Sequence, residues 1–330
     1  MQLDRYAAPC SEPGRIECVR YPSRAYALEA FYGKRNIPLE KTMYVYLPYG
    51  YDSGKKYPVL YLMHGGTDDE GYWFGKGRYS EADRKKYTDA GNITQNLTDH
   101  LIQDKKIEPL IIVTPSFCEN VAEYQNRKEY PLIYFETVNY FWMELENDIM
   151  PYIQKHYATY AEDATKEAFS KVREYTAFAG ASQGSITGLY SVMMHMLDVV
   201  GYVGSFSAGA IRYHLDGKEV KVELDEAKLA KLAEALKNGP ELCCWYNGCG
   251  SHDRMYPTHR ETFDRLKSLC AKELRKEDKE TDNCCFELQE GGEHSYRYWI
   301  KDFYNILQLF FRSREGENAV SGRVPDSIPL

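Results

Sequence analysis

The chain has 330 residues and a formal net charge of −8, from 49 acidic and 41 basic side chains. This length is within reach of one large α/β domain, and a hydrophobic content of 43% is ordinary for a globular protein. The negative charge argues against nucleic acid or an anionic membrane as the main partner. No apolar run approaches the roughly 18 residues that a membrane-spanning helix needs.

The N-terminal segment, residues 1–17, has no apolar core and is therefore not a signal peptide. We expect a cytoplasmic protein, or a secreted one whose signal peptide has been removed. The nine cysteines match no zinc-ribbon or redox spacing. The adjacent pairs Cys243-Cys244 and Cys284-Cys285 lie in apolar runs, where we expect small buried hydrophobic side chains. The sequence does not decide whether any cysteines form a disulfide.

Short apolar runs alternate with amphipathic stretches along most of the chain. The first 50 residues are expected to form antiparallel strands that open a sheet. Buried strands are predicted at 57–64, 109–115, 175–180, 202–209, 242–250 and 284–292, because these runs are apolar on both faces. Helices are predicted at 138–157, 185–197, 257–270 and 296–311. This alternation predicts a single α/β domain over residues 1–330, with a mostly parallel central sheet and helices on both faces.

Two polar segments stand apart from this pattern. Residues 212–240 are polar and helix-prone, and we interpret them as an insertion at the carboxyl edge of the sheet, near an active site. Residues 313–330 are polar and contain proline and glycine, which is typical of a loosely held tail.

A glycine-rich segment, Gly180-Ala181-Ser182-Gln183-Gly184, lies between a predicted strand and a predicted helix. It fits G-x-S-x-G, in which the chain turns sharply from strand to helix and holds the serine at strained backbone angles. The flanking glycines are needed because a Cβ there would clash with the neighbouring strand and helix. A tight turn that merely contains serine is the alternative, but the strand before and the helix after favour a nucleophile at Ser182.

A serine hydroxyl needs a base to act as a nucleophile near neutral pH. In this architecture the acid and then the base follow the serine along the chain. His294, just after the last predicted strand and two glycines, is the best placed of the eight histidines. Asp253 follows the preceding strand and would orient the imidazole, although it could instead cap the helix near Pro257. His252 is a poorer base, because adjacent residues rarely serve one serine as acid and base.

The charge that develops on a tetrahedral intermediate needs two backbone N–H donors. The amide of Gln183 is one candidate. The second is expected from the loop after an early strand, at Gly66, with Thr67 as the alternative. His64 is expected to hold this loop rather than to act in catalysis.

Six segments resemble successive blocks of carbohydrate esterase family 1, which contains feruloyl and acetyl xylan esterases and is related to the esterase D group. They read YPVLYLMHGGTDDEGYWF, LIQDKKIEPLIIVTPSF, MELENDIMPYIQKHY, FAGASQGSITGLYSV, GCGSHDRMYP and GEHSYRYW. The resemblance extends from about residue 40 to 312 and implies an α/β-hydrolase fold that works without a cofactor or metal.

The resemblance also implies roles for individual residues. Ser182 aligns with the family nucleophile, Asp253 with its acid and His294 with its base, and Gly66 and Gln183 align with the amide donors. Family members usually have methionine and two glycines after the serine, whereas this chain has Gln183-Gly184-Ser185. Because the donor is a backbone amide, this departure should affect the pocket wall more than catalysis.

We therefore expect a serine carboxylic-ester hydrolase that releases ferulate or a related hydroxycinnamate from xylan through an acyl-enzyme. Its partner would be a feruloylated or acetylated oligosaccharide or polysaccharide. Thr67, Tyr72 and Trp73 are the expected substrate contacts, and the 29 tyrosines suit an aromatic acyl group, although loop packing would also explain these aromatics. The alternatives are an acetyl xylan esterase and, in another class, an inactive carbohydrate-binding protein of the same fold.

Overall fold

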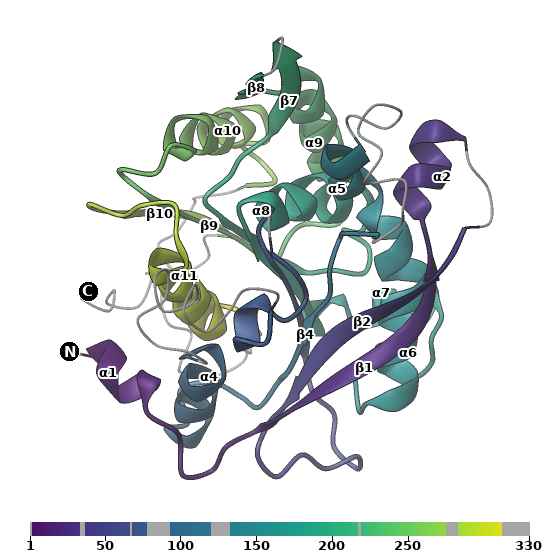
Figure 1. The fold of residues 1–330 in the computed structure, drawn as a ribbon, viewed down its shortest axis with the longest axis vertical. Coiled ribbons are helices and arrows are strands. Elements are labelled where there is room, and N and C mark those ends of the chain that lie inside the picture. Colours follow the sequence, from purple (N-terminus) through teal and green to yellow (C-terminus); the bar gives the residue numbers. More distant parts are fainter. Residues whose placement is uncertain are drawn as a thin grey trace.

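An eight-stranded sheet forms the centre of the molecule (Figure 1). The computed structural model describes residues 2–33, 37–66, 68–77, 93–119, 133–216, 219–274 and 283–311. The strand order is β1-β2-β4-β3-β5-β6-β9-β10. The strands are β1 (Arg15–Arg24), β2 (Pro38–Leu47), β3 (Val59–Met63), β4 (Ile111–Thr114), β5 (Thr176–Ala181), β6 (Tyr202–Phe206), β9 (Cys244–Gly250) and β10 (Cys284–Gln289). Strands β4 to β10 of this order pair in parallel, whereas β1 and β2 are antiparallel, so the predicted α/β fold is confirmed.

Both faces of the sheet are buried, which explains why its central strands are apolar throughout. In β3, Val59, Tyr61 and Met63 pack into the core on one face. Leu60 and Leu62 pack into the core on the other face. Helices α1 (Gln2–Ala7), α4 (Ile93–Gln103) and α11 (Tyr296–Leu309) cover the Leu60 face. Helices α5 (Ile133–Glu144), α6 (Met150–His156), α7 (Lys166–Lys171), α8 (Gln183–Thr187), α9 (Glu226–Asn238) and α10 (Tyr256–Leu269) cover the Val59 face, beside the short α2 (Tyr26–Tyr32).

Two predicted helices are divided by wider, π-helical turns. The stretch predicted at 138–157 consists of α5 and α6, joined by η3 (Leu145–Ile149). The stretch predicted at 185–197 consists of α8 and η5 (Gly188–Met193). Two single-turn 3-10 helices, η1 (Tyr72–Phe74) and η4 (Arg173–Tyr175), lie in the connections between these elements. The helices predicted at 257–270 and 296–311 are confirmed as α10 and α11.

The segment at 212–240 differs from the predicted polar insertion. Its first part is an antiparallel hairpin, β7 (Ile211–Asp216) and β8 (Glu219–Leu224). Its second part is α9, which begins at the N-cap Asp225 and buries Leu229, Leu232 and Leu236. Helix α9 follows β6 and precedes β9 along the chain, and it packs in the core. It is therefore a crossover helix of the sheet, and only the hairpin is an addition to the sheet and its helices. The predicted tail at 313–330 lies outside the described residues.

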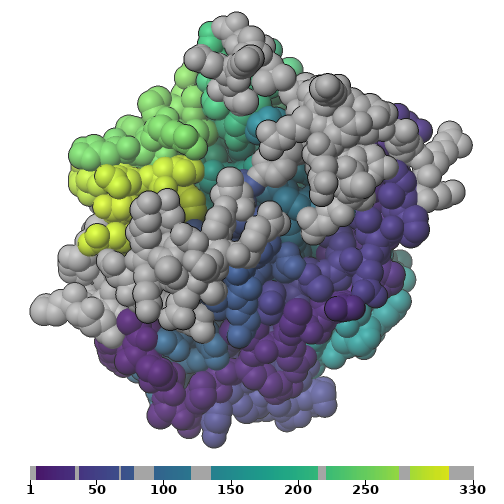
Figure 2. Space-filling view, in the orientation of Figure 1, coloured from purple at the N-terminus to yellow at the C-terminus, as the bar shows by residue number. Residues whose placement is uncertain are grey.

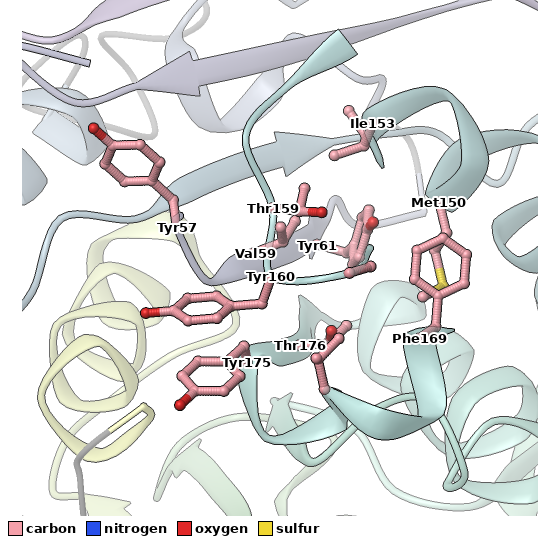
Figure 3. Close-up of a pocket in the computed structure, with 12 residues that line it drawn as sticks. Tyr57, Val59, Tyr61, Met150, Ile153, Thr159, Tyr160, Phe169, Tyr175 and Thr176 are labelled. Atoms are coloured by element: carbon pink, nitrogen blue, oxygen red, sulfur yellow. The ribbon is translucent and has the colours of Figure 1, made fainter. Parts of the chain in front are cut away.

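Many of the tyrosines serve packing. The buried ones include Tyr6, Tyr21, Tyr46, Tyr57, Tyr61, Tyr190, Tyr202, Tyr246, Tyr296 and Tyr304. Near the amino ends of β3 and β5, the rings of Tyr160 and Tyr175 stack 3.6 Å apart beside Tyr57 (Figure 3). The cavity there has a volume of about 10 Å³, room for no more than a water molecule. This group of tyrosines therefore fills space at the edge of the sheet opposite Ser182.

The chain order creates a switch point in the middle of the sheet, where open α/β sheets have their ligand crevice. From β3 the chain crosses to β4 on one side, and after β4 it returns to β5 on the other side of β3. In open α/β sheets, ligands bind at the carboxyl ends of the strands at such a switch point. The loops after β3 and β5 carry His64 to Gly66 and Ser182, so both meet at this crevice.

The last elements of the described chain form one continuous surface. Figure 2 shows the yellow surface of the last described residues directly against the light green surface around α10. No helix within the described ranges has both the length and the apolar character needed to cross a lipid bilayer.

Candidate active site

Ser182 sits at a strained turn between β5 and α8. Its backbone angles are φ 54° and ψ −115°, a combination that costs energy for any residue with a side chain. A Cβ on Gly180 would lie 2.6 Å from the backbone carbon of Gly184. A Cβ on Gly184 would lie 2.6 Å from the carbonyl oxygen of His64. Glycine at both positions therefore lets the strand, the helix and the neighbouring loop approach closely enough to form the turn.

Three side chains from different loops form one hydrogen-bonded line at this turn. The Oγ of Ser182 lies 2.9 Å from Nε2 of His294. The Nδ1 of His294 lies 2.9 Å from both carboxylate oxygens of Asp253. With the proton on Nδ1 donated to Asp253, Nε2 is left to accept the Ser182 proton. The structure thus brings together the three residues singled out in the sequence.

The carboxylate of Asp253 is buried, with a fully inaccessible side chain. Burial on its own would raise the pKa of this carboxyl. The hydrogen bond and charge of His294 outweigh burial, helped by the N–H of Met255 and the hydroxyl of Ser207, so the pKa lies below its ordinary value. The Met255 N–H donates to Oδ1 over 2.8 Å. Asp253 therefore remains ionised, and the N-cap of α10 is Met255 rather than Asp253.

Ser207 and Trp299 support this line, and sequence reasoning missed both. The indole Nε1 of Trp299 donates to Oγ of Ser207 over 2.8 Å, and the Ser207 hydroxyl bonds to Asp253. Ser207 is buried just after β6 with a φ of 57°, an uncommon conformation for serine. The Trp299 ring also meets the ring of His294 edge-on, with centroids 5.1 Å apart. The local sequence signal is weak: a serine in an apolar run.

The two predicted oxyanion donors lie beside Ser182. Gln183 is the first residue of α8, where backbone N–H groups point out of the helix end. The loop after β3 passes close by, since a Cβ on Gly65 would lie 3.7 Å from Cβ of Ser182. Gly66 is the next residue of this loop, and the alternative donor Thr67 lies outside the described residues.

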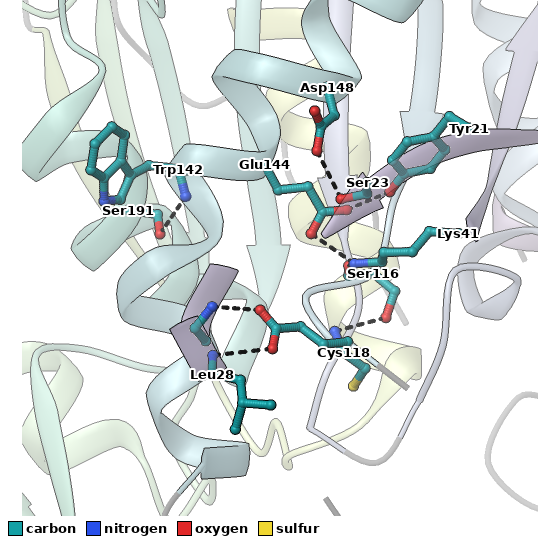
Figure 4. A network of polar contacts seen from close by, with 12 residues as sticks. Tyr21, Ser23, Leu28, Lys41, Ser116, Cys118, Trp142, Glu144, Asp148 and Ser191 are labelled. Carbon is teal, nitrogen blue, oxygen red and sulfur yellow. Dashed lines mark hydrogen bonds and ion pairs between the residues drawn. The ribbon is translucent and has the colours of Figure 1, made fainter. Parts of the chain in front are cut away.

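A buried polar network holds that loop from behind, and Figure 4 shows the part of it around Ser116, Lys41 and Glu144. His64 is 1% exposed, with Nδ1 2.7 Å from the carbonyl oxygen of Gly65 and Nε2 2.8 Å from Oγ of Ser116. The carbonyl oxygen of Ser116 accepts a 2.7 Å hydrogen bond from Lys41, which also pairs with Glu144 at 2.7 Å. Burial raises the pKa of the Glu144 carboxyl, against the opposing influence of Lys41. Both ring nitrogens of His64 are thus engaged in structural hydrogen bonds, which agrees with its expected supporting role.

The two aromatic residues expected at the substrate differ in exposure. Tyr72 is half-buried, and its ring meets the rings of Tyr296 and Trp299 at 5.7 and 6.4 Å. Trp73 is only 1% exposed and donates its indole N–H to the carbonyl oxygen of Met63 over 3.0 Å. The expectation of a substrate contact at Trp73 therefore needs correction, because its ring packs inside the core beneath the loop. Tyr72 is partly accessible, and its ring lies beside that of Trp299, which in turn contacts the ring of His294.

The other histidines near the predicted acid do not compete with His294. His252 is exposed. His259 is completely buried, with Nε2 3.0 Å from Oδ1 of Asn247. Burial lowers the pKa of His259 to about 3, so it is a neutral core residue. The ranges that the structure describes contain no group of three or more His, Cys, Asp or Glu that could hold a metal.

The family model described as "Putative esterase" matches residues 36–310, most of the chain. The chain belongs to this esterase family. The feruloyl esterase module from Clostridium thermocellum, solved with sinapinate as an S954A mutant, is 27% identical; the match covers 95% of this chain and 93% of that one, with a TM-score of 0.68. A family 1 ferulic acid esterase from Anaeromyces mucronatus, solved with ferulic acid, has a TM-score of 0.63 at 22% identity, over 93% of this chain and 95% of that one, and supports the fold. The resemblance to carbohydrate esterase family 1 is confirmed, and this protein is a serine esterase.

Curated relatives of this esterase are longer proteins. Endo-1,4-beta-xylanase Y of Acetivibrio thermocellus is 35% identical over 311 residues, 93% of this chain and 24% of the relative. An endo-1,4-beta-xylanase/feruloyl esterase of Xylanibacter ruminicola is 30% identical over 174 residues, 51% of this chain and 20% of the relative. The chain thus spans a quarter or less of the curated relatives it matches.

Proposed function

We propose that this esterase releases hydroxycinnamate from xylan by an acyl-enzyme mechanism at Ser182. The hydrogen-bonded line from Ser182 through His294 to Asp253 carries the proposal. Nε2 of His294 takes the proton from Ser182 as Oγ attacks the ester carbonyl, and then returns it to the leaving sugar oxygen. Asp253 stabilises the imidazolium that forms between these steps. Water then enters in place of the sugar, and the same groups release the acid.

The amides of Gln183 and Gly66 are proposed to bind the oxygen that becomes negative in the tetrahedral intermediate. Gln183 stands at the N-terminal end of α8, where the peptide dipoles favour negative charge. Gly66 is held at the crevice by the bonds that His64 makes to its loop. The glutamine side chain next to Ser182 is 3% exposed, so replacing the usual methionine leaves the backbone donor in place.

An aromatic acyl group fits the surroundings of the triad. Tyr72 offers a half-buried ring beside Trp299, whose ring in turn borders His294. Flat rings of this kind bind phenolic groups by offset or edge-on stacking. The relatives point the same way, since two of them are described as feruloyl esterases and one of these two was solved with sinapinate.

The test compares methyl ferulate with acetylated xylan as substrates, using the wild-type protein and Ser182→Ala. We expect release of ferulate by the wild type, and a loss of at least about a thousandfold in kcat for Ser182→Ala, as removal of a triad nucleophile causes. Release of acetate without ferulate would favour an acetyl xylan esterase instead. Unchanged turnover in Ser182→Ala would show that the nucleophile has been assigned wrongly, and no turnover in either protein would favour the inactive binding protein.

A further inference from the structure

A second cavity, with a volume of about 350 Å³, lies beside α8 on the side of the sheet that carries α5 and α9. Helices α5, α8 and α9 and the hairpin of β7 and β8 lie together in this part of the molecule (Figure 1). Ile186 lines the cavity, and its N–H donates to the carbonyl oxygen of Ser182 over 3.2 Å. The cavity therefore begins one helical turn from the proposed nucleophile.

The walls of this cavity are firmly built. The hydroxyl of the buried Ser191 on η5 donates to the carbonyl oxygen of Val138 and accepts from the N–H of Trp142, at 2.7 and 3.0 Å (Figure 4). These bonds fix α5 against η5. The hydroxyl of Tyr190 donates to the carbonyl oxygen of Ile211 over 2.6 Å and ties η5 to the start of the hairpin.

Aromatic rings form one part of the lining. Phe135 and Tyr213 stack with their ring centroids 4.3 Å apart, and so join α5 to the hairpin. Trp142 and His195 stack 4.9 Å apart on neighbouring helices. Such flat, partly polar surfaces suit the apolar faces of sugar rings.

Polar groups form the other part, with Lys228 and Lys231 against Glu136 and Asp225. The fifth charged lining residue, Arg212, is paired with Glu223 on the other strand of the hairpin. The ammonium of Lys228 lies 4.8 Å from the ring centre of Tyr190 and bonds to Oδ1 of Asn139. The amide nitrogen of Asn139 donates to Glu136 over 2.9 Å. Burial lowers the pKa of Lys228 and raises the pKa of Glu136, because the ammonium and the carboxyl group are both partly removed from water. A cluster of donors and acceptors with little net charge suits a neutral hydroxyl-rich ligand better than an anion or a hydrocarbon.

The two sides of Ser182 therefore differ in chemistry. Tyr72 and Trp299 pack on the face of the sheet that carries α11, whereas the cavity belongs to the face that carries α5 and α9. An ester whose carbonyl is attacked by Ser182 extends its acyl group and its alcohol to opposite sides. The aromatic acyl group suits Tyr72 and Trp299, which leaves the cavity for the alcohol.

We infer that this cavity is a subsite for the neutral sugar chain to which the hydroxycinnamate is esterified. The inference rests on the proposed function, because it assigns the alcohol part of the same substrate. The volume of the cavity, about 350 Å³, lies in the range of small-molecule sites and exceeds what a methyl or acetyl group fills. The subsite would select esters carried on oligosaccharides over simple alkyl esters.

The test measures kcat/KM for a feruloylated arabinoxylo-oligosaccharide and for methyl ferulate. Lys228→Met keeps the aliphatic stem over Tyr190 and removes the ammonium, and Tyr213→Ala removes a stacking ring. We expect Lys228→Met to lower the ratio of the two kcat/KM values roughly tenfold, the size of one lost hydrogen bond to a charged group. Tyr213→Ala should lower the ratio by up to about tenfold, through the lost ring contact. Lys237→Met, an exposed lysine in the last turn of the same helix, is the matched control and should keep the wild-type ratio.

Equal losses on both substrates would place the acyl group in the cavity, and an unchanged ratio in both variants would remove the subsite; either result overturns the inference. Binding of an unesterified arabinoxylo-oligosaccharide, followed by calorimetry, separates this inference from the proposed function. If the wild type hydrolyses neither ester, the function fails, while weaker binding by Lys228→Met than by Lys237→Met still supports the sugar site. Equal binding by wild type and Lys228→Met would refute it.

Discussion

The proposed catalytic line from Ser182 through His294 to Asp253 is supported by a fourth residue, Ser207, that is not part of it. Ser207 accepts a hydrogen bond from the indole N–H of Trp299, and its own hydroxyl donates one to Asp253. A residue of α11 and a residue after β6 thus orient the proposed acid. A carboxylate that is held by several donors keeps its charge and its direction, which in turn fixes the tautomer of His294. Ser207 is therefore a positioning residue for the proposed reaction.

Removal of this hydroxyl should lower kcat with little change in KM. Ser207→Gly tests the hydroxyl specifically, because glycine accepts the φ of 57° without strain and the main loss is that of the two hydrogen bonds. We expect kcat for methyl ferulate to fall roughly tenfold, as one lost hydrogen bond to a charged group would cause. Steady-state kinetics of the purified variant give the split between kcat and KM.

Ser205→Ala provides the matched control. Ser205 is a buried serine on β6 that accepts from the indole of Trp245 over 3.2 Å. Its loss should reduce stability by about 1 kcal/mol without a specific loss of kcat. If both serine variants lose the same fraction of kcat, then Ser207 acts only through the packing of the core.

At the scale of elements, the turn into α8 is limited by backbone contacts rather than by side chains. Gly184→Ala would place a Cβ 2.6 Å from the carbonyl oxygen of His64 and 2.8 Å from that of Met63. Since neither carbonyl can move without shifting β3 and the oxyanion loop, we expect a loss of about 1–3 kcal/mol in stability. The rate should fall as well, because Gly66 and Gln183 would no longer face one point.

Gly188→Ala is the control for this prediction. Gly188 lies in the same helical stretch with a φ of −58°, and its added Cβ would meet side-chain atoms and no backbone: ring atoms of Phe178 at 3.3 and 3.4 Å and Cγ1 of Val203 at 3.7 Å. A thermal melt and a methyl ferulate assay compare the two variants. A Gly184→Ala protein with wild-type melting temperature and rate would show that the close approach is not needed.

The order of elements could be predicted from sequence because the sheet is covered on both faces. Strands such as β3 and β5 are then continuous apolar runs, which stand out in any reading. The place of α9 in the core was harder to predict, because its exposed lysines and glutamates make the segment polar on average. Its buried leucines, Leu229, Leu232 and Leu236, recur at helical spacing among them. Ser191 bonds to Val138 and Trp142 of α5, a contact between distant segments that no local pattern encodes.

The candidate site, like the fold, has some residues that could be predicted from the sequence and others that could not. Ser182, Asp253 and His294 each follow a strand at a glycine-rich turn, so their places could be predicted one by one. Ser207 and Trp299 meet only because α11 packs across β6 and β9, and Trp73 is buried only because the core closes over it. Such roles follow from the packing of distant segments, which a single sequence does not reveal.

The molecule as a whole holds a buried titratable histidine that affects its response to acid. His259 is fully buried and has a pKa of about 3, lowered by burial, whereas an exposed histidine in the unfolded chain titrates near 6.5. Between these values the unfolded state binds one more proton than the folded state. This residue therefore makes the protein less stable as pH falls from about 6.5 towards 3, by up to about 1.4 kcal/mol per pH unit.

His259→Gln should weaken this dependence, because glutamine keeps an N–H donor for Asn247 but takes up no proton. Urea unfolding at pH 7 and pH 5 gives the free energy of unfolding for each protein. We expect the wild type to lose more stability between these two pH values than His259→Gln, although the variant starts from a lower value because its packing is less complete. His156→Gln, which changes an exposed histidine at the end of α6, should keep the wild-type slope. Identical slopes in all three proteins would mean that His259 is not a neutral residue of the core.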